Sequence, residues 1–385
     1  MANYLWRVVQ SAERLTLDQE VAGSIPAPPA NNIDARIPNN TSTSGSEEHT
    51  AVELVTKKKL LLVAGRVHPE LATEISERLG VPLGDVELAS FPNGERHCRY
   101  GESIRGADLF ILQTHDSIEG TTINDAIMEQ LIMVDAARRA SAKRITVVAP
   151  FFGYSRQDRK ATGREPITAK LVANLFAAAG AKRLVSIDLH SGQIQGFFDG
   201  PVDHLTAMPV LVNWMKANLP PNVVVVSPDS GRVRVAERYG NHLNTDIAMV
   251  HKRRVKVEGA GADGEQSIVE AKGVVGQVKG RPCVIIDDMI DTAGTICAAA
   301  EQLKVEGATE VYAAATHGVL SGPAVDRLKN APIEKLVITN TLPIPPEKNF
   351  DKLVVLSVAE IIADALDAVF EDTSVSEIFA GQNHS

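Results

Sequence analysis

Two adjacent carboxylates and a short run of small, hydroxyl-bearing residues form the most chemically distinctive stretch of this sequence. The apolar run CVII leads directly into Asp287 and Asp288, and Asp291 follows three residues later. Ionised carboxylates only accept hydrogen bonds, so the adjacent pair suits the paired hydroxyl groups of a ribose. We therefore expect these acidic residues to fix a sugar.

The four residues after Asp291 have the composition of a phosphate-binding loop. Small residues let a phosphate approach the backbone closely, and free N–H groups at the start of a helix attract its negative charge. An ordinary helix N-cap would account for only one of the polar groups in this stretch. We expect a 5-phosphate to be held by Thr292, Ala293, Gly294 and Thr295.

Other charged residues also follow directly after apolar runs. His190 follows RLVSIDL, Asp229 follows VVVVSP, and Lys252 and Arg254 follow DIAMVH. In an open α/β sheet, ligands bind beyond the carboxyl ends of the strands. Such crowding of charge at strand ends predicts a functional site rather than scattered, solvated side chains.

The elements that must position these residues are short apolar runs alternating with amphipathic stretches, from about residue 59 onward. The first half contains KLLLVAG, ADLFILQT, RITVVAP and RLVSIDLH, and the second half, from about residue 201, begins with a helix and repeats the rhythm. This alternation predicts mainly parallel sheets covered by helices on both faces. The expected fold class is therefore α/β, with two related domains.

The expected domain boundaries follow the same rhythm. Residues 57–204 and 205–363 form the two α/β domains, and residues 364–385 form a C-terminal helix and tail that pack back on the first domain. Residues 1–56 lack apolar periodicity and are rich in Pro, Asn, Ser and Thr, which predicts a disordered extension. This extension contains Gly-Ser-Ile-Pro, the peptide obtained when the T-arm consensus of a transfer RNA gene is translated in one reading frame. We therefore expect that the native start lies further downstream.

Composition argues against several classes of protein. The chain is 44% hydrophobic and 23% charged, an ordinary globular balance, and its formal charge of −9 argues against a nucleic-acid partner. No run reaches the roughly 18 apolar residues of a membrane span, and no export signal is recognisable. Cys98, Cys283 and Cys297 are widely spaced and predict structural thiols in the cytoplasm.

Several motifs, in order over residues 58–380, resemble those of the ribose-phosphate pyrophosphokinases. Residues 287–295 resemble the phosphoribosyl-diphosphate loop of the type I phosphoribosyltransferase fold, so the resemblance implies two tandem domains of that fold. Nucleobase phosphoribosyltransferases share this loop, but other segments favour the synthase. These segments are FPNGE, YSRQDRKATGREPITAK, DLHSGQIQGFFDGPVDHL, SPDSG and HKRR.

The resemblance implies an enzyme that uses Mg²⁺ and transfers the β,γ-pyrophosphoryl group of ATP to the C1 hydroxyl of ribose 5-phosphate. The products would be AMP and 5-phosphoribosyl 1-diphosphate, which feeds nucleotide, histidine and tryptophan biosynthesis. The resemblance further implies a cytoplasmic homo-oligomer, expected to be a hexamer, with an ATP site shared between subunits. It implies no nucleic-acid or membrane partner.

The resemblance also carries roles onto matching positions. Lys252 and Arg254 would be the catalytic pair, and Arg254 would also contact ribose 5-phosphate. His190 and Asp229 would lie around Mg²⁺, partly through water, because this ion keeps much of its hydration. The loop from Asp287 to Thr295 would bind ribose 5-phosphate. ATP would be contacted by Phe91, Asn93, Gly94, Glu95, Arg156 and Gln157, the last two reaching it across a subunit interface.

Three further segments carry expectations of their own. Residues 159–166 lack a core-forming pattern and carry three positive charges, which predicts a mobile lid. GAGADG at residues 259–264 matches a dinucleotide-binding pattern but follows a charged stretch, so a turn or hairpin tip is expected instead. Arg232 stands where the commoner family pattern has a second Gly, which puts the family's regulation by phosphate and ADP in doubt.

Two other functions remain open at this point. A catalytically inactive homologue with a scaffolding role would lack the catalytic residues, and all of them are present. A phosphoribosyltransferase acting on a base is disfavoured by FPNGE and RQD. Assaying for AMP and phosphoribosyl diphosphate separates the three alternatives.

Overall fold

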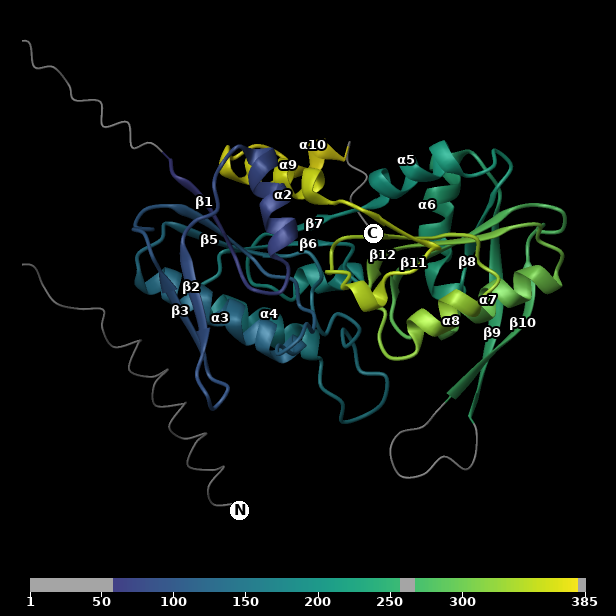
Figure 1. The fold of residues 1–385 in the computed structure, drawn as a ribbon, viewed down its shortest axis with the longest axis horizontal. Helices are drawn as coiled ribbons and strands as arrows, with labels where there is room; N and C mark the ends of the chain where they lie inside the picture. The colour runs from purple at the N-terminus through teal and green to yellow at the C-terminus, as the bar shows by residue number, and fades with distance from the viewer. Residues whose placement is uncertain (1–57, 257–266, 380–385) are drawn as a thin grey trace, which may run out of the picture. The chain divides into compact units, whose positions relative to one another are not determined.

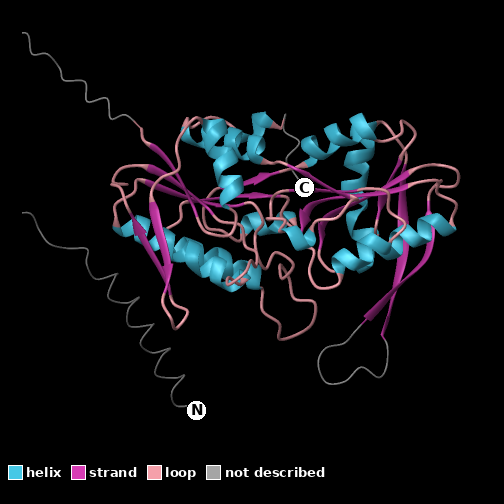
Figure 2. Cartoon of the chain, viewed as in Figure 1, coloured by secondary structure: helices cyan, strands magenta, loops and turns pink. Residues whose placement is uncertain are grey.

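The computed structural model describes residues 58–256 and 267–379, with side chains except for residues 252–272. The expected disordered extension (residues 1–56) and the expected turn at residues 259–264 therefore lie outside the described residues. The described part contains two large sheets and one two-stranded sheet, flanked by helices (Figure 2).

The first large sheet has five parallel strands in the order β1-β4-β5-β6-β7. Every residue of β4 is buried, because helices cover both faces of a parallel sheet. This is why residues 109–112 of the strand are continuously apolar rather than alternating. The strands are β1 (Leu60–Ala64), β4 (Asp108–Leu112), β5 (Arg144–Ala149), β6 (Arg183–Ile187) and β7 (Val202–Leu205), and the helices are α2 (Pro69–Leu79), α3 (Ile123–Arg139) and α4 (Thr168–Ala179).

The second large sheet has seven strands in the order β10-β9-β8-β11-β12-β13-β14, all parallel to their neighbours except β10, which is antiparallel to β9. The strands are β8 (Val224–Ser227), β9 (Ile247–Lys256), β10 (Ser267–Val275), β11 (Cys283–Ile290), β12 (Val311–Gly318), β13 (Leu336–Thr339) and β14 (Leu353–Leu356). The helices are α5 (Met208–Asn218), α6 (Val233–Leu243), α7 (Gly294–Val305), α8 (Ala324–Asn330), α9 (Ala359–Phe370) and α10 (Val375–Ile378).

These two sheets confirm the predicted fold class of mainly parallel sheets flanked by helices. In Figure 1, α2, α5, α6 and α9 lie on one side of the strands, and α3, α4, α7 and α8 lie on the other. A separate antiparallel hairpin of β2 (Val86–Ser90) and β3 (Arg96–Tyr100) packs against α3.

The start of the second half differs from the prediction. A helix was expected from about residue 201, but Val202–Leu205 form β7, which pairs in parallel with β6 and extends the first sheet. Asp203 and His204 interrupt the apolar pattern of this short strand, which is why sequence periodicity does not reveal it. The helix begins only at Met208.

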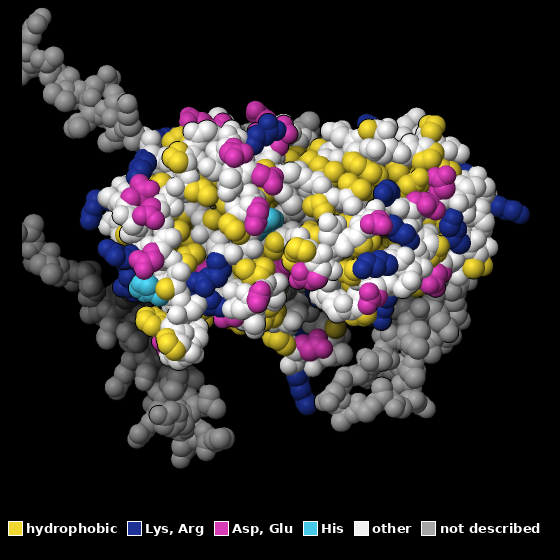
Figure 3. All heavy atoms as spheres, in the orientation of Figure 1, with side chains coloured by type: hydrophobic (Ala, Val, Ile, Leu, Met, Phe, Trp, Pro, Cys, Tyr) yellow, Lys and Arg dark blue, Asp and Glu magenta, His cyan; other side chains and the backbone are white. Residues whose placement is uncertain are grey.

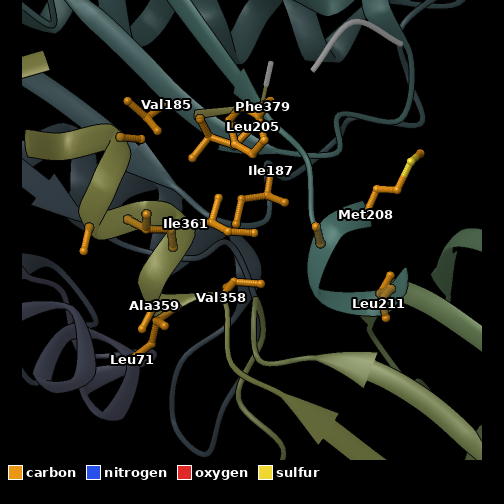
Figure 4. Packing of buried hydrophobic residues seen from close by; sticks show 14 of the residues in the cluster. Leu71, Val185, Ile187, Leu205, Met208, Leu211, Val358, Ala359, Ile361 and Phe379 are labelled. Atoms are coloured by element: carbon orange, nitrogen blue, oxygen red, sulfur yellow. The ribbon is translucent and has the colours of Figure 1, made fainter. Parts of the chain in front are cut away.

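An apolar layer packs across both sheets. It includes Leu62 and Val185 from the first sheet and Val284 from the second, all almost fully buried. Figure 4 shows Leu71 of α2 beside Ala359 of α9 in this layer, so the last long helix packs near the first one. Burial of each large apolar side chain stabilises the fold by about 1.5–3 kcal/mol.

The C-terminal helix begins earlier than expected. Helix α9 starts at Ala359, so a boundary between residues 363 and 364 falls inside it. The whole helix belongs to the apolar layer, with eight buried residues along its length. It is therefore part of the core.

Acidic side chains gather over α2 and α9 (Figure 3). Glu74, Glu77 and Glu360 line a shallow groove there, together with Arg78. None of the described helices is both long enough and apolar enough to cross a bilayer.

Candidate active site

The acidic loop lies at the carboxyl end of β11 in the second sheet. Asp287 and Asp288 are still within the strand, and α7 begins at Gly294. Ala293, which precedes the helix, has φ of +61°, a left-handed backbone conformation that non-glycine residues seldom adopt. Such strain is characteristic of functional loops, and here it turns the chain sharply from strand to helix.

Hydrogen bonds from the segment after β12 and from a side chain of α8 hold this loop in place. The N–H groups of Leu320 and Ser321 donate to the carbonyl groups of Ile290 and Asp291, each at 3.0 Å. Arg327 Nη1 donates to the Thr292 carbonyl at 2.9 Å. The loop is thus fixed before any ligand binds, and the N-terminus of α7 is available to an anion.

The two carboxylates face charged side chains from two other strand ends. Asp288 Oδ2 lies 2.6 Å from His190 Nδ1 and 2.6 Å from Arg232 Nη2. Asp287 Oδ1 lies 3.4 Å from Arg232 Nε and accepts the Asp288 N–H at 2.9 Å. His190 follows β6 and Arg232 follows β8, so both sheets contribute to this cluster, which we call the acidic cradle (Asp287, Asp288, His190 and Arg232).

The surroundings of the cradle shift the pKa values of its two carboxyl groups in opposite directions. Burial, followed by the adjacent charge of Asp288, raises the pKa of Asp287 well above its usual value. Burial would also raise the pKa of Asp288, but the hydrogen bond with His190 and the charge of Arg232 outweigh it and lower that pKa to about 2. Near neutral pH, Asp288 therefore carries the negative charge that Arg232 balances.

Asp229 lies after β8, in the same region of the second sheet. Its Oδ1 accepts the N–H of Gly231 at 2.9 Å, which caps the short turn Ser230–Arg232. Within the part of the chain that the structure describes, no three His, Cys, Asp or Glu side chains are grouped closely enough to enclose a metal ion. The structure thus does not join His190 and Asp229 into an all-protein metal cage.

A cleft of about 570 Å³ opens between segments of the two halves. Arg156 and Gln157 line it from the first half, and Asp291 and Thr292 line it from the second. Arg156 Nη1 forms an ion pair of 2.7 Å with Asp291 Oδ2. Predicted nucleotide-binding and sugar-binding residues therefore meet within one chain.

The remaining predicted ATP contacts lie elsewhere in the fold. Phe91, Asn93, Gly94 and Glu95 form the exposed turn between β2 and β3, and Phe91 is 53% exposed. None of the four is among the residues lining the 570 Å³ cleft. An exposed aromatic ring at a hairpin tip is available to a ligand or to another protein surface.

Lys252 and Arg254 lie on the extension of β9. This strand pairs with β8 as far as Met249, opposite Ser227, the last residue of β8. Lys252 and Arg254 occur further along β9, where the backbone pairs with Ala271 and Val269 of β10. They thus follow the carboxyl end of the neighbouring strand, two positions apart along β9.

The cleft also contains polar residues that sequence reasoning did not select. Asp116 is only 8% exposed, and burial raises its pKa. His115 beside it is fully buried, and Lys348 lines the cleft from the second half. His115 and Asp116 follow the end of β4 after Gln113 and Thr114, so the same strand-end rule could have identified them.

Asp188 ties the two halves together near the cradle. Its Oδ2 accepts from the Thr316 hydroxyl at 2.6 Å and from the Ala207 N–H at 3.0 Å. Thr316 belongs to β12 of the second sheet, whereas Asp188 follows β6 of the first. The φ of Asp188 is +37°, a conformation that Asp tolerates better than most residues.

Comparisons with known proteins agree with this arrangement. Residues 60–180 match the family model of the N-terminal domain of ribose phosphate pyrophosphokinase, and residues 268–380 match that of the phosphoribosyl synthetase-associated domain. The crystal structure of phosphoribosylpyrophosphate synthetase from Mycobacterium smegmatis is 48% identical, covers 82% of this chain and 100% of its own, and superposes with a TM-score of 0.75.

Curated relatives are similar over nearly the same range. The ribose-phosphate pyrophosphokinase of Streptomyces avermitilis is 52% identical over 334 residues, which is 86% of this chain and 100% of that protein. The one from Bifidobacterium longum is 53% identical over 326 residues, which is 84% of this chain and 93% of that protein.

Together, the two sheets and the loop after β11 define an α/β protein with tandem type I phosphoribosyltransferase-like domains. The sequence identity, which extends over the full length of two of these relatives, establishes the family as well as the fold. The chain belongs to the ribose-phosphate pyrophosphokinase family of enzymes.

Proposed function

We propose that this enzyme transfers the β,γ-pyrophosphoryl group of ATP to the C1 hydroxyl of ribose 5-phosphate, giving 5-phosphoribosyl 1-diphosphate and AMP. The S. avermitilis relative, named ribose-phosphate pyrophosphokinase, supports this reaction. The observation that carries it is the cleft in which Arg156 and Gln157 meet Asp291 and Thr292. A nucleotide and a sugar phosphate must bind side by side for this transfer.

In this proposal, ribose 5-phosphate binds first through its two ends. The diol contacts the carboxyl groups of Asp287 and Asp288, and the 5-phosphate binds the N–H and hydroxyl groups of the loop that ends in Thr295. The pre-formed loop lowers the entropic cost of orienting the C1 hydroxyl for attack. Attack on the β-phosphorus of ATP then breaks the bond to the α-phosphate oxygen, and AMP leaves.

Lys252 and Arg254 are the proposed catalytic pair. Negative charge develops on the transferring group and on the departing AMP, and two fixed cations stabilise it more in the transition state than in the ground state. Residues 159–166 are the proposed lid that excludes water. In the described structure this segment is exposed, and Glu165 accepts hydrogen bonds from the N–H groups of Ala161 and Thr162.

Mg²⁺ is the proposed cofactor. His190 and Asp229 supply one imidazole and one carboxylate near the cradle, a donor set too small for an all-protein cage but suited to an ion that keeps water and binds substrate phosphates. These two residues would hold it, and it would neutralise the phosphate charge of ATP.

The remaining parts of the proposal concern assembly and location. The resemblance implies that Arg156 and Gln157 reach ATP across a subunit interface, but both line a cleft with Asp291 and Thr292 of their own chain. We therefore propose instead that the turn at residues 91–95 supplies the contacts of Phe91, Asn93, Gly94 and Glu95 to ATP bound to a neighbouring subunit. The proposed assembly is a cytoplasmic homo-hexamer. We also propose domains over residues 57–204 and 205–363, followed by a C-terminal helix and tail over residues 364–385. Size-exclusion chromatography with light scattering tests the assembly, and a mass other than six chains rejects the hexamer.

The reaction is tested by incubating the purified protein with ribose 5-phosphate, Mg²⁺ and ATP. The expected result is AMP and phosphoribosyl diphosphate in equal amounts. Formation of ADP, or no consumption of ATP, excludes the proposed reaction. A base added with phosphoribosyl diphosphate serves as the comparison, because a nucleobase phosphoribosyltransferase would release pyrophosphate from that mixture.

A further inference from the structure

Arg232 makes more contacts with the acidic cradle than any cap at the start of α6 requires. Its side chain points back from the turn after β8, and Nη2 lies 2.6 Å from Asp288 Oδ2. Its Nε lies 3.4 Å from Asp287 Oδ1, and its Nη1 donates to the His190 carbonyl at 3.3 Å. All three guanidinium nitrogens are therefore used, a pattern that the single ammonium of lysine cannot reproduce.

These contacts fix both carboxylates at once. The side chains of Asp287, Asp288 and Arg232 are 14%, 10% and 16% exposed, so their interactions are little screened by water. Among the described side chains, Arg232 is the cation that contacts both groups, so its removal would leave the buried charge of Asp288 without the guanidinium that balances it. Without Arg232, the pair would rotate apart or turn toward water.

The geometry also leaves carboxylate oxygens of Asp287 and Asp288 that could bind a ligand. Arg232 and the backbone engage Asp287 Oδ1, and Arg232 and His190 engage Asp288 Oδ2. Each carboxyl group has a second oxygen that takes no part in these contacts with Arg232, His190 and the backbone, and the two carboxyl groups also share a hydrogen bond with each other. Two oxygens held at a fixed spacing match two neighbouring hydroxyl groups, whereas freely rotating carboxyl groups do not.

We propose that Arg232 is a positioning residue that holds Asp287 and Asp288 in the orientation that receives the 2- and 3-hydroxyls of the sugar. Arg232 thereby sets both the affinity for ribose 5-phosphate and the selectivity for an intact diol. This inference rests on the proposed function, because it assigns the diol to the acidic cradle.

The test compares Arg232→Ala and Arg232→Lys with the unchanged enzyme. In steady-state kinetics, Arg232→Ala should raise KM for ribose 5-phosphate about 10- to 100-fold, the range typical for outer contacts that orient ligand-binding groups. KM for ATP should change less than KM for ribose 5-phosphate, because both ion pairs of Arg232 are with sugar-binding carboxyl groups, and only its hydrogen bonds with His190 involve a proposed Mg²⁺-binding residue. Arg232→Lys should give an intermediate value, since it restores the charge but not the planar fork.

Selectivity provides the readout that a merely structural role would not change. The ratio of kcat/KM for ribose 5-phosphate to kcat/KM for 2-deoxyribose 5-phosphate should fall about tenfold in Arg232→Ala. The reason is that Asp287 and Asp288, no longer held in place, bind the 2-hydroxyl more weakly. Calorimetric titration of ribose 5-phosphate without nucleotide should show the same loss of affinity. This measurement does not depend on turnover.

Arg234→Ala is the matched control, because Arg234 is an exposed arginine two residues further on, in the first turn of α6. It should leave both KM values and the selectivity unchanged. Circular dichroism checks that each variant is folded, and if Arg232→Ala is not, Arg232→Lys alone carries the comparison.

The inference is overturned if Arg232→Ala leaves KM for ribose 5-phosphate unchanged, or lowers it, because a lower KM would show that Arg232 competes with the sugar for the carboxyl groups. It is also overturned if kcat/KM falls by the same factor for ribose 5-phosphate and for 2-deoxyribose 5-phosphate. The proposed function fails separately, when the unchanged enzyme forms no phosphoribosyl diphosphate.

Discussion

The imidazole Nδ1 of His190 lies 2.6 Å from the carboxylate Oδ2 of Asp288. His190 follows β6 in the first sheet, and Asp288 lies near the end of β11 in the second. This contact shows that the proposed metal-binding and sugar-binding residues come from different sheets of the same chain. The site therefore depends on how the two sheets pack against each other.

The proposed catalytic pair gives the first prediction. Lys252→Ala should lower kcat at least about 100-fold, the range expected for the loss of a charge that stabilises the transition state. Its unfolding midpoint should stay close to that of the unchanged enzyme. Lys143→Ala is the control, because Lys143 is exposed and lies in the first half. A loss below about tenfold would remove Lys252 from the catalytic pair.

The second prediction concerns the ion pair of Arg156 and Asp291. Its side chains are 57% and 24% exposed, so Arg156→Ala should lower the free energy of unfolding by less than about 1 kcal/mol. Activity should nevertheless fall at least about tenfold, because both side chains line the cleft.

A second exposed ion pair, between Arg139 and Asp135 on α3, supplies the comparison. Arg139→Ala should have a similarly small effect on stability and none on activity. If the two arginine variants have equal activity, Arg156 has no role in the reaction. Urea denaturation and initial rates provide the two measurements.

The third prediction concerns pH and His115. Burial lowers the pKa of His115 to about 4, although the hydrogen bond with Gln130 partly opposes this. Because the unfolded value is about 6.5, the unfolded chain binds more protons between pH 6.5 and 4, and stability falls as the pH falls through that window. The contribution of this one group reaches about 1.4 kcal/mol per pH unit.

His115→Asn tests this dependence, because its amide oxygen can replace Nδ1 as the acceptor of the Gly153 N–H, a hydrogen bond of 2.9 Å. The free energy of unfolding should depend less steeply on pH below 6.5 in this variant than in the unchanged enzyme. His97→Asn, at an exposed position, should leave the slope intact. Identical slopes for all three proteins would show that His115 titrates normally.

The fourth prediction concerns Asp188, which joins the two sheets. Asp188→Ala should lower the free energy of unfolding by about 3 kcal/mol, because the Thr316 hydroxyl and the Ala207 N–H lose their acceptor and alanine tolerates the left-handed backbone poorly. Asp188→Asn keeps an acceptor oxygen and suits that backbone, so its loss should be less than half as large. Equal losses in denaturant unfolding would contradict this account of Asp188.

The sequence predicts the strands of the two sheets well where both faces are buried. Runs such as that of β4 are continuous and apolar because neighbouring strands and helices cover every residue. Strand β7 was missed because Asp203 and His204 interrupt its pattern, and Arg183 and Leu189 satisfy them through contacts that form only in the folded sheet. Local periodicity cannot represent such contacts.

In the candidate site, too, the sequence pattern predicts some residues but not the contacts that form only in the folded chain. The strand-end rule selects His190, Asp229 and the loop from Asp287, because chain polarity alone puts these residues at the carboxyl edge of a sheet. It does not reveal that Arg232 reaches Asp288 or that Arg156 meets Asp291. These contacts depend on side-chain length and on the packing of distant segments, which neither periodicity nor motif spacing encodes.

The central claim is that a pyrophosphoryl group, rather than a single phosphoryl group, moves to the sugar. It is tested most directly with ATP labelled separately at the β- and γ-phosphorus, followed by separation of the sugar product. Both labels should appear in the product in equal amounts, and the nucleotide released should be unlabelled AMP. Transfer of the γ-label alone, with the β-label retained in ADP, would contradict the claim.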